Sequence, residues 1–179
     1  MPARTRPALP PFEHVVDAHG AALLRFCVAR VGAVRAEDCF QETMLAALRA
    51  YPSLRDPQAV RGWLFAIAAR KVLDALRDGA RAPRAEADVE RLAPAAPAAL
   101  RDPALWARVA RLPAKQREAV TLRHVADLSH REIAAIMATS EAAARRNVFE
   151  GLARLRREAA AAAPSARSHG SRRRAVSRT

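Results

Sequence analysis

Aromatic residues, glycine and cysteine are scarce in this sequence. Of its 179 residues, 4% are aromatic, 6 are glycines and 2 are cysteines. Runs of β-branched residues are few, whereas long segments rich in alanine, leucine and arginine are typical of helices. The chain is long enough to bury one core of ordinary size or two small ones. We therefore expect an all-α protein.

Long apolar runs are missing as well. No stretch of about 18 apolar residues occurs, so we expect no segment that inserts into a membrane. The first residues, MPARTRPALPPFEH, contain arginines but neither the apolar core nor the cleavage site of a secretion signal. These absences lead us to expect a cytoplasmic protein.

The motifs of catalytic and metal sites are also absent. The 5 histidines have neither HExxH spacing nor the spacing of a zinc site shared with cysteine. Neither a glycine-rich phosphate loop nor a GxSxG elbow occurs. Cys27 and Cys39 lack CxxC spacing, so we expect small core residues and not a disulfide or a redox pair. The sequence therefore predicts that the protein is not an enzyme and that it has no catalytic residue, metal ion or cofactor.

Acidic residues are far fewer than basic residues. The chain has 31 lysines and arginines against 18 acidic residues, a formal net charge of +13. Such an excess indicates a polyanionic partner, either a nucleic acid or a membrane surface. Residues 104–158 carry +5, and residues 159–179, an expected disordered basic tail, add another +5. No basic amphipathic helix stands by itself, so the distribution favours DNA over a membrane.

Residues 128–157 have the pattern of two helices joined by a very short turn. Ser129 and Glu132 can form a capping box, and Ser140 can cap a second helix from Glu141. The face opposite the apolar stripe of that helix is polar: Arg146 and Glu150, flanked by Arg145 and Asn147. This geometry suits a helix-turn-helix whose second helix enters the major groove of DNA. An ordinary helical hairpin with a solvated basic face is the alternative.

The first half of the chain predicts helices over residues 12–31, 36–51 and 58–78, the first of them interrupted or bent near Gly20. On the second helix, an acidic pair flanks an outward leucine, with a glutamine beside it: Asp38, Glu42, Leu45 and Gln41. The opposite face is expected to be buried: Phe40, Met44, Ala47, Leu48 and Tyr51. The acidic face suits docking on a basic helical partner, although a solvated charged face is the commoner explanation.

On the third helix, Trp63 is in line with Arg70 and Arg77 at helical spacing. An aromatic ring beside arginines is an arrangement that stacks on unpaired bases while it holds their phosphates. A tryptophan packed in the core is the equal alternative. The two interpretations are compatible if only one face of the ring is covered.

Composition divides the chain into five segments. We expect a flexible N-terminus (1–11), a helical domain (12–78), a linker rich in alanine and proline (79–103), a helix-turn-helix domain (104–158) and the basic tail (159–179). In the fourth segment, Pro103 opens a helix with an apolar stripe of Leu105, Val109 and Leu112. Another helix follows from Ala114.

Three stretches in this order resemble bacterial sigma factors of the extracytoplasmic-function type. They are AEDCFQETMLAALRAY, RGWLFAIAARKVLDALR and LPAKQREAVTLRHVADLSHREIAAIMATSEAAARRNVFEGLARLRR. The similarity extends over residues 12–157. It implies two helical domains, sigma region two and sigma region four, joined by a linker. It also implies a factor that binds core RNA polymerase and promoter DNA, with an anti-sigma factor as a further candidate partner.

The resemblance assigns candidate residues to three surfaces. Core-polymerase binding falls on Asp38, Gln41, Glu42 and Leu45. Capture of the minus-ten element falls on the loop over residues 51–60 and on Trp63, Arg70, Lys71 and Arg77. Recognition of the minus-thirty-five element falls on Ser140, Glu141, Arg145, Arg146, Asn147 and Glu150.

Some positions depart from the usual pattern of this family. Arg70 stands where an asparagine is common, and Asp78 where a second arginine is common. In the second helix of the hairpin, Ala143-Ala144 and Glu150-Gly151 replace the usual Thr-Val and Arg-Ala pairs. An outward Glu150 would repel phosphate unless it accepts a hydrogen bond from a cytosine amino group.

Two other functions remain open at this point. The chain suits a helix-turn-helix regulator that binds DNA without polymerase, although such a regulator needs neither the acidic face nor the Trp63 helix. It also suits a degenerate sigma factor that acts as a protein-interaction module and sequesters an anti-sigma partner.

Overall fold

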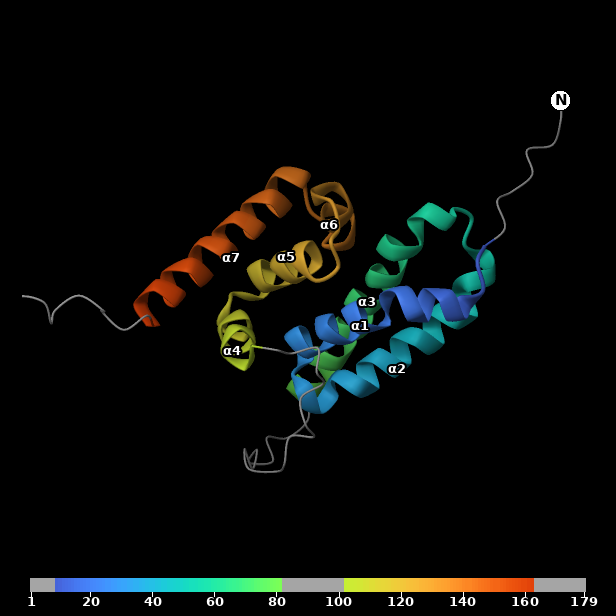
Figure 1. Ribbon diagram of the computed structural model, residues 1–179, viewed down its shortest axis with the longest axis horizontal. Helices are drawn as coiled ribbons and strands as arrows, with labels where there is room; N and C mark the ends of the chain where they lie inside the picture. Colours follow the sequence, from blue (N-terminus) through green and yellow to red (C-terminus); the bar gives the residue numbers. More distant parts are fainter. Residues whose placement is uncertain (1–8, 82–101, 163–179) are drawn as a thin grey trace, which may run out of the picture.

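The computed structural model describes residues 9–81 and 102–162, and every regular element in these two stretches is helical. They contain seven α-helices and two short 3-10 turns, so the expected all-α class is confirmed. In Figure 1 the N-terminal helices α1 to α3 form one group and the helices α4 to α7 form a second group beside it. Most of the expected N-terminal segment, linker and tail, residues 1–8, 82–101 and 163–179, lies outside the described residues.

Three helices form the N-terminal half: α1 (Phe12–Val31), α2 (Ala33–Ala50) and α3 (Val60–Arg81). Gly32 separates α1 from α2, and its φ of +80° is a conformation that residues with a side chain rarely adopt. This tight turn lets α2 begin three residues before the predicted start. α1 is continuous through Gly20, so the predicted interruption there is absent. Two 3-10 turns, Tyr51–Ser53 and Pro57–Ala59, lead from α2 into α3.

The core of this half depends on the few aromatic residues that the chain has. Phe26 of α1 meets Phe65 of α3 edge to face, with ring centroids 5.5 Å apart and an angle of 86° between the ring planes. Both rings are fully buried, and aromatic side chains bury more apolar area than other residues. Cys27 and Cys39 are free thiols inside the same core, so the predicted core placement of both cysteines is confirmed.

Four helices form the C-terminal half: α4 (Pro103–Arg111), α5 (Ala114–His124), α6 (His130–Ile136) and α7 (Glu141–Ala162). The predicted capping box of α6 is present, because the Ser129 N–H donates to Glu132 Oε2 over 2.8 Å and Ser129 Oγ accepts from the Glu132 N–H. The Ser140 hydroxyl accepts from the Ala143 N–H at the start of α7, as predicted. The expected stripe on α4 is only partly buried, since Leu105 is 39% exposed.

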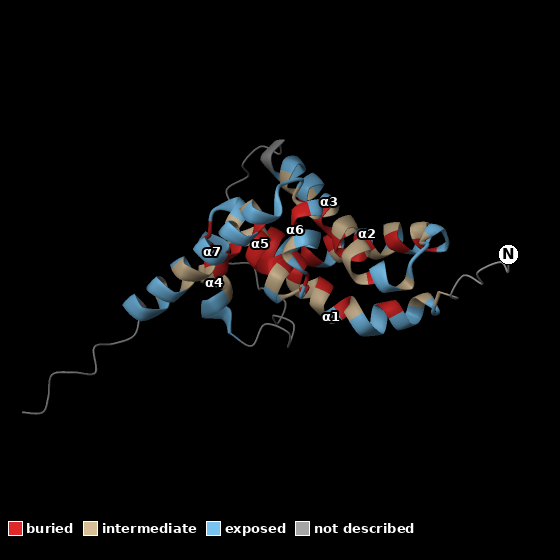
Figure 2. Ribbon diagram, turned by 90° about the horizontal axis from the view of Figure 1, so that it is seen from above, coloured by how far each residue is buried: buried red, intermediate tan, exposed pale blue. Residues whose placement is uncertain are grey.

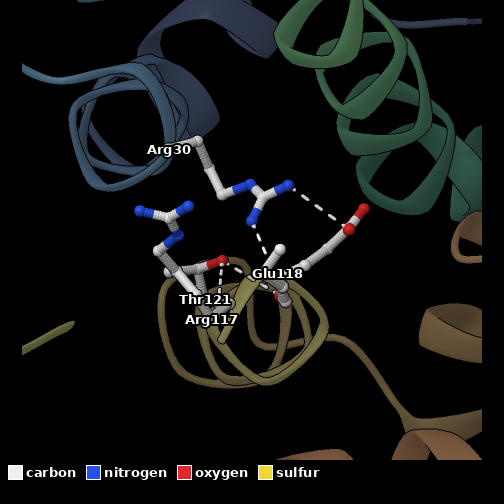
Figure 3. Close-up of polar contacts among 5 residues, drawn as sticks. Arg30, Arg117, Glu118 and Thr121 are labelled. Carbon is white, nitrogen blue, oxygen red and sulfur yellow. Dashed lines mark hydrogen bonds and ion pairs between the residues drawn. The ribbon is translucent and has the colours of Figure 1, made fainter. Parts of the chain in front are cut away.

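The two halves are joined by a buried arginine. Arg30, at the end of α1, donates to the Ala114 carbonyl and to Glu118 Oε2 over 3.3 Å each, and its side chain is 2% exposed. Figure 3 shows its guanidinium pointing from α1 to the start of α5. Burial lowers the pKa of Arg30, and the charge of Glu118 opposes that shift. Buried positions are dense on α5, where the halves meet (Figure 2).

A second contact between the halves involves α3 and α6. Arg61 pairs with Asp127 over 3.1 Å just before α6. Glu132 Oε1 lies 3.1 Å from where a Cβ on Gly62 would be, so the two helices approach closely there. Next to this contact is an open hollow of about 370 Å³, lined mainly by alanines and by Trp63, Arg70, Leu73 and Ile136.

Gly151 sets how closely α7 approaches α5. A Cβ on Gly151 would lie 2.6 Å from Val120 Cγ2 and 3.4 Å from Gln116 Cβ. In an open helix, Gly to Ala gains up to about 1 kcal/mol. Here the β-branched Val120 is stiff, so we expect Gly151→Ala to lower the free energy of unfolding by about 1–3 kcal/mol. Urea unfolding measures this change.

A mutant cycle supplies the control for Gly151. In a Val120→Ala background the clash is removed, and Gly151→Ala should then be neutral or stabilising. An equal loss of stability in both backgrounds would contradict the close approach of the two helices.

The buried ion pair gives a second prediction. Glu118→Leu removes the carboxylate and leaves the Arg30 charge buried, so it should lower the free energy of unfolding by about 3 kcal/mol. The double variant Arg30→Met/Glu118→Leu replaces both charges by apolar groups and should recover most of that loss. Urea unfolding of the two variants compares them, and equal stabilities would show that Glu118 does not compensate Arg30.

Candidate polymerase and nucleic-acid interfaces

The four residues predicted for polymerase binding lie on one exposed face of α2. Asp38, Gln41, Glu42 and Leu45 are spaced at i, i+3, i+4 and i+7, and all four are exposed. Leu45 is 53% exposed, and such exposed apolar surface beside charged residues can mark a site of protein–protein contact. The opposite side of α2 packs into the core through Cys39, Thr43 and Ala47, so the helix is held firmly while this face is presented to solvent.

Leu48 extends the same face, and the sequence analysis placed it wrongly. It was predicted to be buried, but it is 51% exposed, one turn beyond Leu45. Leu48 lies at the border between the two faces of α2, where apolar character alone does not decide burial. We call Asp38, Gln41, Glu42, Leu45 and Leu48 together the α2 stripe.

Trp63 is partly packed against the protein and partly open, so it fits both the core interpretation and the base-stacking interpretation. One side of its ring packs against Tyr51, with centroids 6.1 Å apart, and Tyr51 is fixed in turn by a hydrogen bond from its hydroxyl to the Pro10 carbonyl. The ring is only partly buried and also lines the hollow beside α6, together with Arg70. The structure therefore brings Trp63 and Arg70 together, with part of the tryptophan open.

The other two cations of α3 are engaged by carboxylates. Arg77 is exposed and donates to Asp74 Oδ1 over 3.4 Å within the same helix. Lys71 does not line the hollow, and its ammonium lies 3.2 Å from Glu42 of the α2 stripe. The candidate residues of α3 thus form one group, Trp63 and Arg70, with Lys71 at the boundary to α2.

On α7, the arginines predicted for DNA are exposed along the outer face. Arg145 is paired with Glu141 one turn earlier, over 3.1 Å, and Arg146 is exposed beside it. Asn147 is half-buried, and Ser140 uses its hydroxyl to cap the helix. Arg146 is therefore the basic side chain of this face best placed to meet a partner.

Glu150 is exposed, but its carboxylate is held by α5. Gln116 Nε2 donates to Glu150 Oε2 over 3.0 Å. Sequence reasoning placed Glu150 outward and did not find this partner, because the two residues are far apart in the chain. The hydrogen bond holds the negative charge of Glu150 beside α5.

Sequence reasoning also missed Phe149. It is 68% exposed on α7, one turn after Arg145 and Arg146. The signal was available, since Phe149 falls outside the apolar stripe of Ala144, Val148 and Leu152. A large apolar side chain among exposed arginines is suited to contact the methyl group of thymine.

Neither a metal site nor a membrane span occurs in the part of the chain that the structure describes. No group of three histidine, cysteine or acidic side chains there is arranged to hold a metal ion. None of the described helices is long and apolar enough to cross a membrane.

Comparison with known proteins identifies both halves. The family model for Sigma-70 region 2 matches residues 15–82, and the model for Sigma-70 region 4 matches residues 103–155. The ECF RNA polymerase sigma factor SigD of Mycobacterium tuberculosis (strain ATCC 25618 / H37Rv) is 37% identical over 157 residues, which cover 78% of this chain and 73% of SigD. The ECF RNA polymerase sigma factor ShbA of Streptomyces griseus subsp. griseus is 32% identical over 151 residues, with coverages of 74% and 79%.

Solved structures share the fold. The sigma factor RpoE in complex with the anti-sigma factor NepR from Bartonella quintana matches with a TM-score of 0.70 and 22% identity, over 85% of this chain and 98% of that one. CnrH in complex with the cytosolic domain of CnrY matches with a TM-score of 0.61 and 23% identity, over 85% and 89%. The two regions occur here in order, and curated relatives resemble most of the chain. The protein therefore belongs to the extracytoplasmic-function family of RNA polymerase sigma factors.

Proposed function

We propose that this sigma factor divides its work among three surfaces. The α2 stripe binds core RNA polymerase, Trp63 and Arg70 of α3 hold the melted minus-ten strand, and the outer face of α7 reads the minus-thirty-five element. The protein would act without catalysis or a cofactor, in the cytoplasm where polymerase and promoter DNA are found.

The observation that carries this proposal is the exposed α2 stripe. Two leucines, 53% and 51% exposed, lie beside two carboxylates on a helix whose other side is locked in the core. Leaving such apolar surface in water is unfavourable, and a partner that covers it gains both apolar burial and charge complementarity. A regulator that binds DNA without polymerase has no use for this surface, so the stripe supports the sigma function over that alternative.

The remaining alternative is a protein that mainly sequesters an anti-sigma factor. RpoE from Bartonella quintana, which has this fold, is seen in complex with the anti-sigma factor NepR. An anti-sigma factor is therefore a further proposed partner for this chain. The exposed Arg146 and Phe149 of α7 favour a factor that still contacts promoter DNA.

In vitro transcription tests the proposal as a whole. Core polymerase with this protein and genomic DNA should give discrete transcripts that core polymerase without it does not give. Footprints on DNA without polymerase would instead indicate a stand-alone regulator, and neither activity would indicate a protein-interaction module.

The α2 stripe yields a third prediction. The variant Asp38→Ala/Gln41→Ala/Glu42→Ala should lose at least tenfold in affinity for core polymerase, because charged anchors of an interface are lost, while its unfolding temperature changes little. Co-purification with core polymerase and thermal unfolding measure the two effects. The variant Glu13→Ala/Asp17→Ala removes the same charge from exposed positions on α1 and should bind normally. Equal binding by both variants would contradict the assignment.

A fourth prediction concerns Arg146. A good side-chain contact to a base edge is worth about 1–3 kcal/mol, so Arg146→Ala should weaken holoenzyme binding to its promoter by roughly 5- to 150-fold and leave binding to random DNA almost unchanged. Arg157→Ala, an exposed arginine three turns later on α7, is the matched control. Removal of residues 164–179 should weaken binding to both DNAs about equally, since phosphate contacts carry no sequence information. Equal losses on both DNAs for Arg146→Ala would exclude a base contact.

A further inference from the structure

One ion pair connects the α2 stripe with α3. Lys71 Nζ lies 3.2 Å from Glu42 Oε2, and the two side chains are 33% and 62% exposed. Glu42 belongs to the surface proposed for polymerase, and Lys71 to the helix proposed for the minus-ten strand. A single carboxylate is therefore in contact with both functional surfaces.

The ion pair weakens the attraction between Lys71 and DNA phosphates in the free protein. A carboxylate beside the ammonium cancels much of its field, so a DNA phosphate approaching Lys71 meets a weaker attraction. It also meets repulsion from Glu42 itself. Lysine has a flexible stem and its ammonium rotates freely, so little holds Lys71 at Glu42 except this charge.

From this geometry we infer that docking of core polymerase on Glu42 releases Lys71 to bind a phosphate of the minus-ten strand. A cation of polymerase that pairs with Glu42 neutralises the carboxylate and competes with the ammonium for it. The inference rests on the proposed function and adds to it a coupling between two of its surfaces. Glu42 then has two roles, as a polymerase contact and as a switch for Lys71.

The size of the coupling follows from the exposure of the pair. An exposed ion pair is weak, so releasing Lys71 should raise the affinity for DNA only about two- to fivefold. The effect should shrink as salt increases, because salt screens exposed charges. Coupling between binding sites is reciprocal, so DNA bound at Lys71 should raise the affinity for polymerase by the same factor.

Amine labelling measures this coupling at the residue itself, because Lys71 and Lys115 are the only lysines in the sequence. The full-length protein is labelled briefly with an amine-acylating reagent, and peptide mass spectrometry gives the extent of labelling at each lysine. Titration with a short single-stranded oligonucleotide of mixed sequence gives the DNA concentration that half-protects Lys71. Lys115, exposed on α5, reports general changes in DNA affinity.

Glu42→Gln removes the charge but keeps the shape of the side chain. It should lower the half-protecting DNA concentration for Lys71 two- to fivefold and leave that of Lys115 unchanged. Core polymerase added to the natural protein should produce the same shift, and without DNA it should increase labelling of Lys71. In Glu42→Gln, any polymerase that still binds should produce no additional shift.

Asp38→Asn is the matched control, since it removes the same charge from the same stripe one turn earlier. An equal shift in Asp38→Asn and Glu42→Gln would overturn the inference and leave a general charge effect. No shift in Glu42→Gln, or protection of Lys71 by polymerase without DNA, would overturn it as well. The proposed function fails separately, if the natural protein does not co-purify with core polymerase.

Discussion

A buried cation is the constraint on which the arrangement of this protein depends. The side chain of Arg30 is almost completely buried, and a buried charge is tolerated only where hydrogen-bond acceptors compensate it. Both of its acceptors, the Ala114 carbonyl and Glu118, belong to the first turns of α5. The end of α1 therefore fixes the position and orientation of α5. Because α6 and α7 pack on α5, this contact and the second one between α3 and α6 together set the orientation of the helix-turn-helix relative to α3.

On α7, two residues that are unusual for the family lie at one contact. Glu150 and Gly151 stand where this family commonly has arginine and alanine, and both contact α5 through Gln116. Gly151 lets the helices approach, and the carboxylate of Glu150 accepts from the Gln116 amide at the same place. The two residues that depart from the common pattern therefore lie at the same contact between α7 and α5. The residues that point outward, Arg146 and Phe149, are presented on a helix positioned in this way.

Local chemistry made part of this structure predictable from the sequence. The capping box at Ser129, the cap at Ser140 and the apolar stripe of α7 involve residues a few positions apart, so their pattern is visible in the sequence. The same helical geometry is sufficient to predict the exposure of Leu48 and Phe149. Partners such as Arg30 and Glu118, or Gln116 and Glu150, depend on how helices pack, and the local pattern contains no signal for them.

The cysteines illustrate the same limit. The apolar helical pattern around each cysteine predicted its burial. The same pattern did not predict that the two cysteines lie next to each other. Cys27 and Cys39 come from adjacent helices and are hydrogen-bonded to each other, and this contact raises the pKa of the Cys27 thiol. Spacing in the sequence gave no indication of it, since it results from the tight turn at Gly32 that folds α2 back along α1.

The close approach of Glu132 to Gly62 has a consequence for how the sequence of this protein can change. Glu132 completes the capping box of α6, so its carboxylate has little freedom to move away. A side chain at position 62 would press on that carboxylate and disturb the cap of a helix in the other half of the chain. The side chains that fit at positions 62 and 132 therefore depend on each other. The N-terminal and C-terminal halves share this constraint although separate stretches of sequence encode them.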